Sequence, residues 1–281
     1  MRRFLLGTAL LALTVQAAPA REQTDAPDAA ILGFSPDGRY FAFEEYGFDP
    51  VSDALASVIH VIDRTTNKEA EGFPLGVVPE EIGGEFPGKA GGFQADLDKL
   101  MEAEDGPDVD ALRQLVHDAA APKLAALKIA PTGRRLAGVP LTQRAPAPSK
   151  DAPLDFVLWP TLPGAIPDQQ YVYRLEAVGE PEPADCYGTS LPARERKVEF
   201  RLRVSLTWPE PKQVAEGTTT YMLPTPADSC AMDMWISDIV APPRVDPDAP
   251  QVVALFLSQV WQSHADDARW RAAFLPLPQP R

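Results

Sequence analysis

A histidine close to two carboxylates, His264 with Asp266 and Asp267, is the best candidate in this sequence for acid–base chemistry. A carboxylate can orient an imidazole ring so that the ring takes up or gives a proton, as in many hydrolases. A polar surface turn explains the same three residues more simply. The other histidines, His60 and His117, have no metal-ligand spacing with one another or with a cysteine. No Gly-x-Ser-x-Gly motif is present, so the sequence does not predict a hydrolase with a nucleophile elbow.

Acidic residues gather around Asp105, Asp108 and Asp110, and their oxygens are the ligand type that Ca²⁺ prefers. Their order does not match a calcium-binding loop, which needs oxygens at alternate positions around a glycine and a later glutamate. A helix break followed by an N-cap accounts for the segment better. We therefore expect Asp108 to begin a helix, with a Ca²⁺ site as the alternative.

Two adjacent carboxylates, Glu44 and Glu45, follow an aromatic segment that is typical of a β-strand. Neighbouring side chains of a strand point to opposite faces of the sheet. Only one of the two is therefore expected to face a core, and the other is expected on the surface. A buried, functional Glu44 or Glu45 is the alternative.

Residues 1–20 have the three-part layout of a cleavable signal peptide. Two arginines, Arg2 and Arg3, precede an apolar run over 4–15, and small residues follow, with cleavage after either Ala17 or Ala20. The apolar run is shorter than the roughly 20 residues that span a bilayer. The sequence thus predicts an exported protein, periplasmic or secreted, with no membrane span after signal cleavage.

The chain has two cysteines, Cys186 and Cys230. In an oxidising compartment, an isolated pair most simply forms one disulfide. Such a bond would close a loop of about 45 residues and stabilise the fold by roughly 4 kcal/mol. A redox or metal-binding pair is the alternative, but no Cys-x-x-Cys motif supports it.

The net charge of −14 limits the classes of molecule that the protein is expected to bind. Binding to nucleic acid and docking on anionic lipid both require a basic surface. We therefore expect neither a nucleic acid nor a lipid membrane as the partner. Acidity suits a cationic ligand or a metal, although a solvated acidic surface explains it as well. No motif in the sequence predicts a bound cofactor. The expected partner is an envelope protein or a small ligand.

The first half of the chain is expected to combine strands and helices. Residues 21–30 are expected to be disordered, and the region 31–141 to hold a β-meander and a helix pair. Strands at 31–34 and 39–47 flank Ser35-Pro36-Asp37-Gly38, a strong turn signal, and a third strand follows at 58–63. Helical spacing appears over 93–103 and again after Asp108, with extension past Pro122 to 129. A weak echo of the first hairpin at 129–137 predicts a second hairpin.

The second half, 154–275, follows a Pro/Ala/Ser-rich connection at 142–153 and has a β pattern. Strands are expected at 154–159, 171–178, 198–208, 218–223, 234–240 and 252–257, and none is assigned around Trp270. The proline-rich end from Pro276 is expected to fray. The predicted fold is a β-dominated α+β protein with a larger antiparallel sheet or sandwich and one disulfide. Whether the two halves pack as one domain is left open.

Two segments resemble known proteins. The segment 34–43 is similar to the blade motif of periplasmic TolB-type β-propellers, but a propeller needs four or more such repeats, so a single hairpin is expected. Segments 33–47 and 230–240 together resemble a family of predicted secreted proteobacterial proteins of unknown function. That resemblance implies a periplasmic location and transfers no catalytic residue.

These observations favour a non-enzymatic periplasmic module that binds a partner or associates with the envelope. The alternatives are a hydrolase acting on an envelope substrate through His264 with Asp266 or Asp267, and a calcium-dependent module that uses the acids around Asp108.

Overall fold

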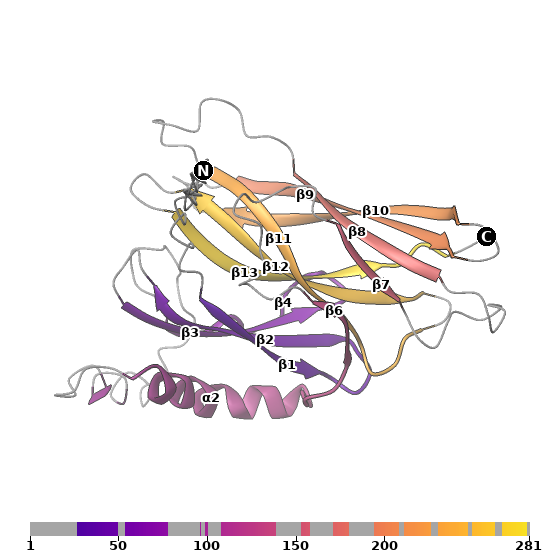
Figure 1. Ribbon diagram of the computed structural model, residues 1–281. Coiled ribbons are helices and arrows are strands. Elements are labelled where there is room, and N and C mark those ends of the chain that lie inside the picture. Colours follow the sequence, from indigo (N-terminus) through magenta and orange to yellow (C-terminus); the bar gives the residue numbers. More distant parts are fainter. Residues whose placement is uncertain are drawn as a thin grey trace, which may run out of the picture.

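The computed structural model describes residues 27–49, 54–77, 96, 99–100, 108–138, 153–157, 171–179, 194–207, 211–225, 230–246, 249–261 and 266–279. In these residues, thirteen strands form three antiparallel sheets, and one continuous helix, α2, accompanies them (Figure 1). The expectation of a β-dominated α+β protein is confirmed. The signal-peptide segment 1–20 lies outside the described residues.

Sheet A starts with the predicted hairpin. The Asp37 carboxylate accepts hydrogen bonds from the Ser35 hydroxyl and the Arg39 amide, and Gly38 takes a φ of 68°, which closes the turn. The sheet has the order β1-β2-β3-β4, and β5 also pairs with β3, so the meander is confirmed. β1 begins at Asp28, earlier than the expected strand. The strands are β1 (Asp28–Phe34), β2 (Tyr40–Asp49), β3 (Ala54–Asp63), β4 (Lys68–Glu69) and β5 (Leu75–Val77).

Helix α2 (Val109–Ala126) confirms the second helix of the predicted pair. The Asp108 side chain accepts a hydrogen bond from the Asp110 amide and caps the first turn, and the helix continues through Pro122. Its buried side chains recur at helical spacing and pack on sheet A; they are Leu112, Val116 and Ala120. Of the first expected helix, only residues 96, 99 and 100 are described, and they are helical.

The second half of the chain supplies most of two further sheets. Sheet B has the order β13-β12-β11-β6, and sheet C has the order β10-β9-β8-β7. The strands of sheet B are β6 (Arg134–Gly138), β11 (Cys230–Ala241), β12 (Gln251–Trp261) and β13 (Asp266–Pro276). Those of sheet C are β7 (Leu154–Val157), β8 (Tyr171–Gly179), β9 (Arg194–Leu206) and β10 (Lys212–Thr225). The six expected strands are present, and β13 is an additional one.

The elements stack in four layers, with α2 below sheet A, sheet B in the middle and sheet C on the far side (Figure 1). The central strand β12 is buried on both faces, because alternate side chains enter different cores. Val252, Ala254 and Phe256 pack toward sheet C, whereas Val253, Leu255 and Leu257 pack toward sheet A. A strand buried on both faces is a continuous apolar run, which is what the sequence over 252–257 shows.

The second hairpin expected over 129–137 does not form. Ala130 instead forms an isolated bridge with Phe34 at the end of β1, and the following strand β6 pairs with β11 of sheet B. Gly133, with a φ of 107°, lies in the turn between these two pairings. The short Pro-x-Gly segment therefore carries the chain from one sheet to another.

The expected disulfide has no observation to support it. Cys186 lies outside the described residues, and for Cys230 only the backbone is described, at the start of β11 opposite Trp261. The proline-rich end is not frayed over its described part, 276–279. Leu277 is buried, and its amide donates a hydrogen bond of 2.8 Å to the carbonyl of Pro250.

Side chains from sheet A cover the outer edge of β13. The Glu45 carboxylate accepts a 3.0 Å hydrogen bond from the amide of Trp270. The Asn67 amide group accepts a bond of 2.8 Å from the Phe274 amide and donates one of 3.2 Å to the Phe274 carbonyl. The Asn67 side chain thus makes the two hydrogen bonds that the backbone of a neighbouring strand would make. Asn67 has a left-handed φ of 54°, a conformation that asparagine tolerates.

Candidate functional site

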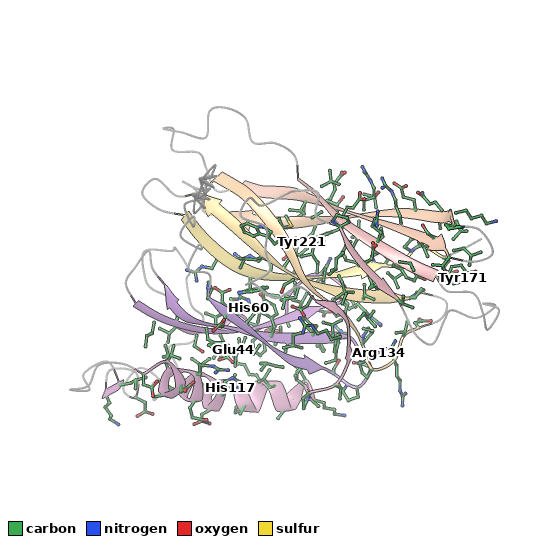
Figure 2. The ribbon with its side chains drawn as sticks, viewed as in Figure 1. Glu44, His60, His117, Arg134, Tyr171 and Tyr221 are labelled. Carbon is green, nitrogen blue, oxygen red and sulfur yellow. The ribbon has the colours of Figure 1, made fainter. Side chains whose placement is uncertain are left out.

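Glu44 is fully buried between sheet A and α2 and is bound on both of its oxygens (Figure 2). Arg113 donates two hydrogen bonds to it, at 3.0 and 2.9 Å, while His117 lies 3.1 Å away and Ser57 donates at 3.3 Å. The Arg113 guanidinium also stacks on the ring of Tyr46, 3.5 Å from its centre. Burial alone would raise the pKa of Glu44, but the hydrogen bonds and charges of Arg113 and His117 outweigh it, so the pKa is lowered.

Glu45 is buried on the opposite face, between sheets A and B. Arg269 donates to one of its oxygens at 2.9 Å, and the Trp270 amide donates to the other at 3.0 Å. His60 lies 4.0 Å from Glu45 through one ring nitrogen and 2.7 Å from Glu69 through the other. The expectation that one of Glu44 and Glu45 is exposed is wrong, because sheet A is covered on both faces.

These two buried groups hold layers together. Glu44 joins sheet A to α2, and Glu45 joins sheet A to β13. Each carboxylate oxygen already has protein partners, and both carboxylates are themselves almost fully buried. A general base needs a free lone pair that a substrate can reach. The arrangement therefore suits a structural role better than proton transfer.

The predicted acid–base group cannot be assembled from the described side chains. His264 lies outside the described residues. The backbones of Asp266 and Asp267 open β13, opposite Trp261 and Val260 of β12. Their placement in a strand, and not in a turn, is a finding that the sequence did not predict.

The acids considered for Ca²⁺ have other roles where they are described. Asp108 caps α2, and Asp110 lies in its first turn, 3.6 Å from the guanidinium of Arg113. Asp105 lies outside the described residues. Among the side chains that the structure describes, no group of three or more His, Cys, Asp or Glu residues is placed to hold a metal ion.

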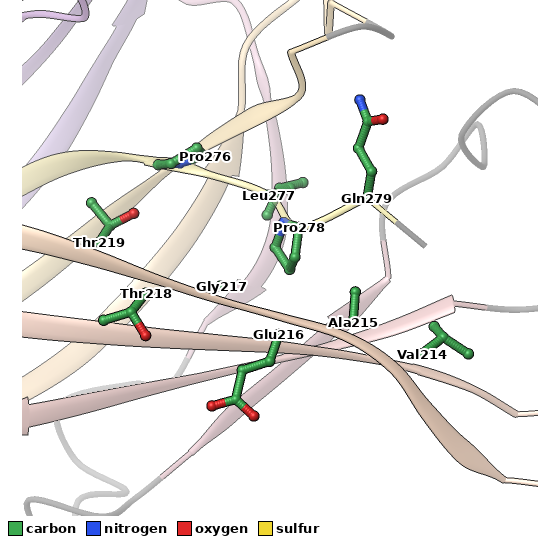
Figure 3. Close-up of a pocket in the computed structure, with 10 residues that line it drawn as sticks. All are labelled: Val214, Ala215, Glu216, Gly217, Thr218, Thr219, Pro276, Leu277, Pro278 and Gln279. Atoms are coloured by element: carbon green, nitrogen blue, oxygen red, sulfur yellow. The ribbon is translucent and has the colours of Figure 1, made fainter. Parts of the chain in front are cut away.

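A groove lies between β10 and the segment that follows β13, and it is the candidate functional site (Figure 3). Its volume is about 660 Å³, and residues 214–219 and 276–279 line it. Pro278 lies over the backbone of Gly217, where an added Cβ would be 3.5 Å from the proline ring. The buried Leu277 anchors the second wall. In Figure 3, Ala215 and Thr219 extend toward the C-terminal segment, whereas Thr218 extends to the other side of β10. The concave surface is thus made of the Ala215 methyl group, the Thr219 side chain, proline rings and backbone.

The charged group of the groove, Glu216, is already engaged. Its carboxylate points away from the C-terminal segment in Figure 3. Gln213 donates to it at 2.9 Å and Arg203 at 3.4 Å, while Arg201 lies 3.5 Å away. The hydrogen bond from Gln213, assisted by the two arginines, lowers the pKa of Glu216. The carboxylate therefore stays ionised and is poorly suited to act as a base near neutral pH.

The sequence indicates one wall of this groove but does not indicate that the two walls lie side by side. The strand expected at 218–223 covers the threonines of β10, and the run Gly217-Thr218-Thr219-Thr220 is visible in the sequence. The opposite wall comes from the end expected to fray. The two walls are about 60 residues apart in sequence, so no local pattern joins them.

No family model, no curated protein and no solved structure matches this chain. The geometry of the described residues is therefore the basis on which a function can be proposed. Within the described residues, no helix has the length and apolar character that crossing a bilayer requires.

Proposed function

We propose that the protein is an exported, non-enzymatic binding module of the bacterial envelope, and that its ligand lies in the groove between β10 and residues 276–279. The observation that carries the proposal is the composition of this groove. It offers the Ala215 methyl group, the Thr219 side chain, proline rings and backbone, while its one carboxylate, Glu216, is held by neighbouring side chains. Such a surface provides contacts for a ligand but no acid, base or nucleophile pair.

Two further observations support the proposal. The buried carboxylates Glu44 and Glu45 each bind an arginine and join layers of the fold, which supports a structural role for them. The export part rests on the signal-like segment 1–20 and on the resemblance of segments 33–47 and 230–240 to secreted proteins. An envelope protein or a small ligand is the expected partner.

Methyl-detected NMR with a fragment library tests the proposed site. We expect binding fragments to shift the methyl signals of Val214, Ala215 and Leu277, because these residues line or anchor the groove. The variant Thr219→Trp places an indole on the side of β10 that faces the C-terminal segment and should remove these shifts. Gln114→Trp, on the exposed face of α2 and outside the lining, should leave them unchanged. Shifts that occur only elsewhere in the molecule would contradict the assignment.

A further inference from the structure

We infer that residues 217–222 of β10 bind an extended, lysine- or arginine-bearing peptide segment by strand addition. The inference rests on the proposed binding function and names the class of ligand. Strand addition uses the unpaired N–H and C=O groups of an edge strand to bind a partner's backbone, and side chains then provide specificity.

The first step is that β10 is an edge strand. It is the last strand in the order β10-β9-β8-β7, and it is 14 residues long. In the part of the chain that the structure describes, β9 is the one strand that pairs with it. One side of a long strand therefore presents backbone hydrogen-bonding groups that no described strand satisfies.

The second step is that the middle of this edge lacks the protection found at its ends, where Lys212 and a bulge at Gln213–Ala215 lie on one side and Pro224 lies on the other. Residues 217–222 read Gly-Thr-Thr-Thr-Tyr-Met, with no charge and no proline, and Met222 is 41% exposed. Threonine and tyrosine favour an extended backbone. Other edges differ: β7 has four residues, β6 begins with two arginines, and Glu45 and Asn67 cover β13. Natural proteins use such devices to prevent strand addition, so their absence over residues 217–222 indicates an edge kept for pairing.

The third step is charge, which selects the partner. A net charge of −14 repels a second copy of this chain and attracts a cationic segment. Glu216, at one end of the uncharged stretch, is exposed and ionised. Arg201 and Arg203 approach it from β9, which lies on the side away from an incoming strand. A lysine on the incoming strand would then be a cross-strand neighbour of Glu216.

The probe for this inference is a fluorescent nine-residue peptide of alternating threonine and lysine, titrated into the full-length protein and followed by anisotropy. Two matched peptides serve as controls: one has glutamate in place of lysine, and one has methyl groups on alternate backbone nitrogens. We expect the basic peptide to bind at least about tenfold more tightly than either control. Equal binding of the backbone-methylated peptide would overturn strand addition.

Two variants that add the same positive charge at different positions test whether binding depends on the β10 edge or on the net charge of the protein. Thr220→Lys adds a positive charge on the exposed edge and should weaken binding of the basic peptide by about tenfold. Gln114→Lys adds the same charge on the exposed face of α2 and should leave binding unchanged. Equal effects of the two variants would overturn the edge assignment. If fragments still shift Val214 and Leu277 while the peptide does not bind, strand addition fails and the binding function stands; if neither binds, the proposed function fails as well.

Discussion

At the scale of single residues, the neighbours Glu44 and Glu45 lie in two different interiors. Glu44 faces α2 and Glu45 faces β13, and each is bound by an arginine, Arg113 in one case and Arg269 in the other. A buried carboxylate without such a partner would be strongly destabilising, so each pair must be formed when the layers close. A substitution of Glu44 therefore tests the interface between sheet A and α2, and a substitution of Glu45 tests the interface between sheet A and β13.

Replacement of Glu44 by glutamine should destabilise the protein by about 3 kcal/mol at pH 7, because Arg113 then loses its buried counter-charge. The pKa of Glu44 is lowered from 4.5 in the folded state. The carboxylate therefore contributes its full stability above pH 4.5, and that contribution is lost as the pH falls through the lowered pKa. The gap between wild type and Glu44→Gln should shrink below pH 4.5.

Chemical denaturation over a pH series measures this gap. The control is Glu71→Gln, which removes the same charge from an exposed carboxylate in the turn after β4 and should leave the denaturation midpoint unchanged. A gap that is constant from neutral to acid pH would show that the charge of Glu44 does not stabilise the fold.

At the scale of elements, the edges of the sheets decide how the layers associate. β13 is closed by the Asn67 amide group, which binds both backbone groups of Phe274, whereas β10 has no such cover among the described residues. One edge is therefore used to join sheets A and B, and the other is the edge proposed above for peptide binding.

Replacement of Asn67 by glycine should cost about 2 kcal/mol, since glycine tolerates the φ of 54° but cannot make the two hydrogen bonds to Phe274. Amide hydrogen exchange should show faster exchange at Phe274. Asn67→Asp keeps the oxygen that accepts from the Phe274 amide, so protection there should persist. Unchanged exchange in Asn67→Gly would mean that Asn67 does not close this edge.

The parts of the fold that were predictable are those that short stretches determine. The turn at Ser35-Pro36-Asp37-Gly38 and the cap at Asp108 are specified by adjacent residues, and both are confirmed. Pairings between distant segments were not predictable. β13 begins with polar residues, so its sequence did not show the apolar pattern of a strand. The burial of Glu45 depends on Arg269, which is 224 residues away in the sequence. The groove combines two such segments, so the sequence alone could not reveal it.

At the scale of the whole molecule, sheet B supplies one wall to each of two cores. Phe256 packs with Phe200 of sheet C, and Leu255 packs in the cluster that holds Phe41 and Phe43 of sheet A. Neither flanking sheet buries its inner face without sheet B. The layers should therefore unfold together.

Replacement of Leu255 by alanine should destabilise the protein by about 3 kcal/mol, because it leaves a cavity between sheets A and B. Hydrogen exchange should rise together in β3 and in β9, although Leu255 faces only one of these sheets. Met222→Ala, at an exposed position, should change stability by less than about 0.5 kcal/mol. Two separate unfolding transitions, with β9 unaffected, would contradict the shared middle layer.

The position of sheet B in the chain also has a consequence for biosynthesis. Its three long strands, β11, β12 and β13, follow all the strands of the two sheets that they cover. While the ribosome is still making them, the apolar faces around Phe41 and Phe200 have no cover, so the nascent chain cannot complete a stable core. The export proposed above would be served by this order, because the layer that completes both cores is synthesised after the two sheets that it covers.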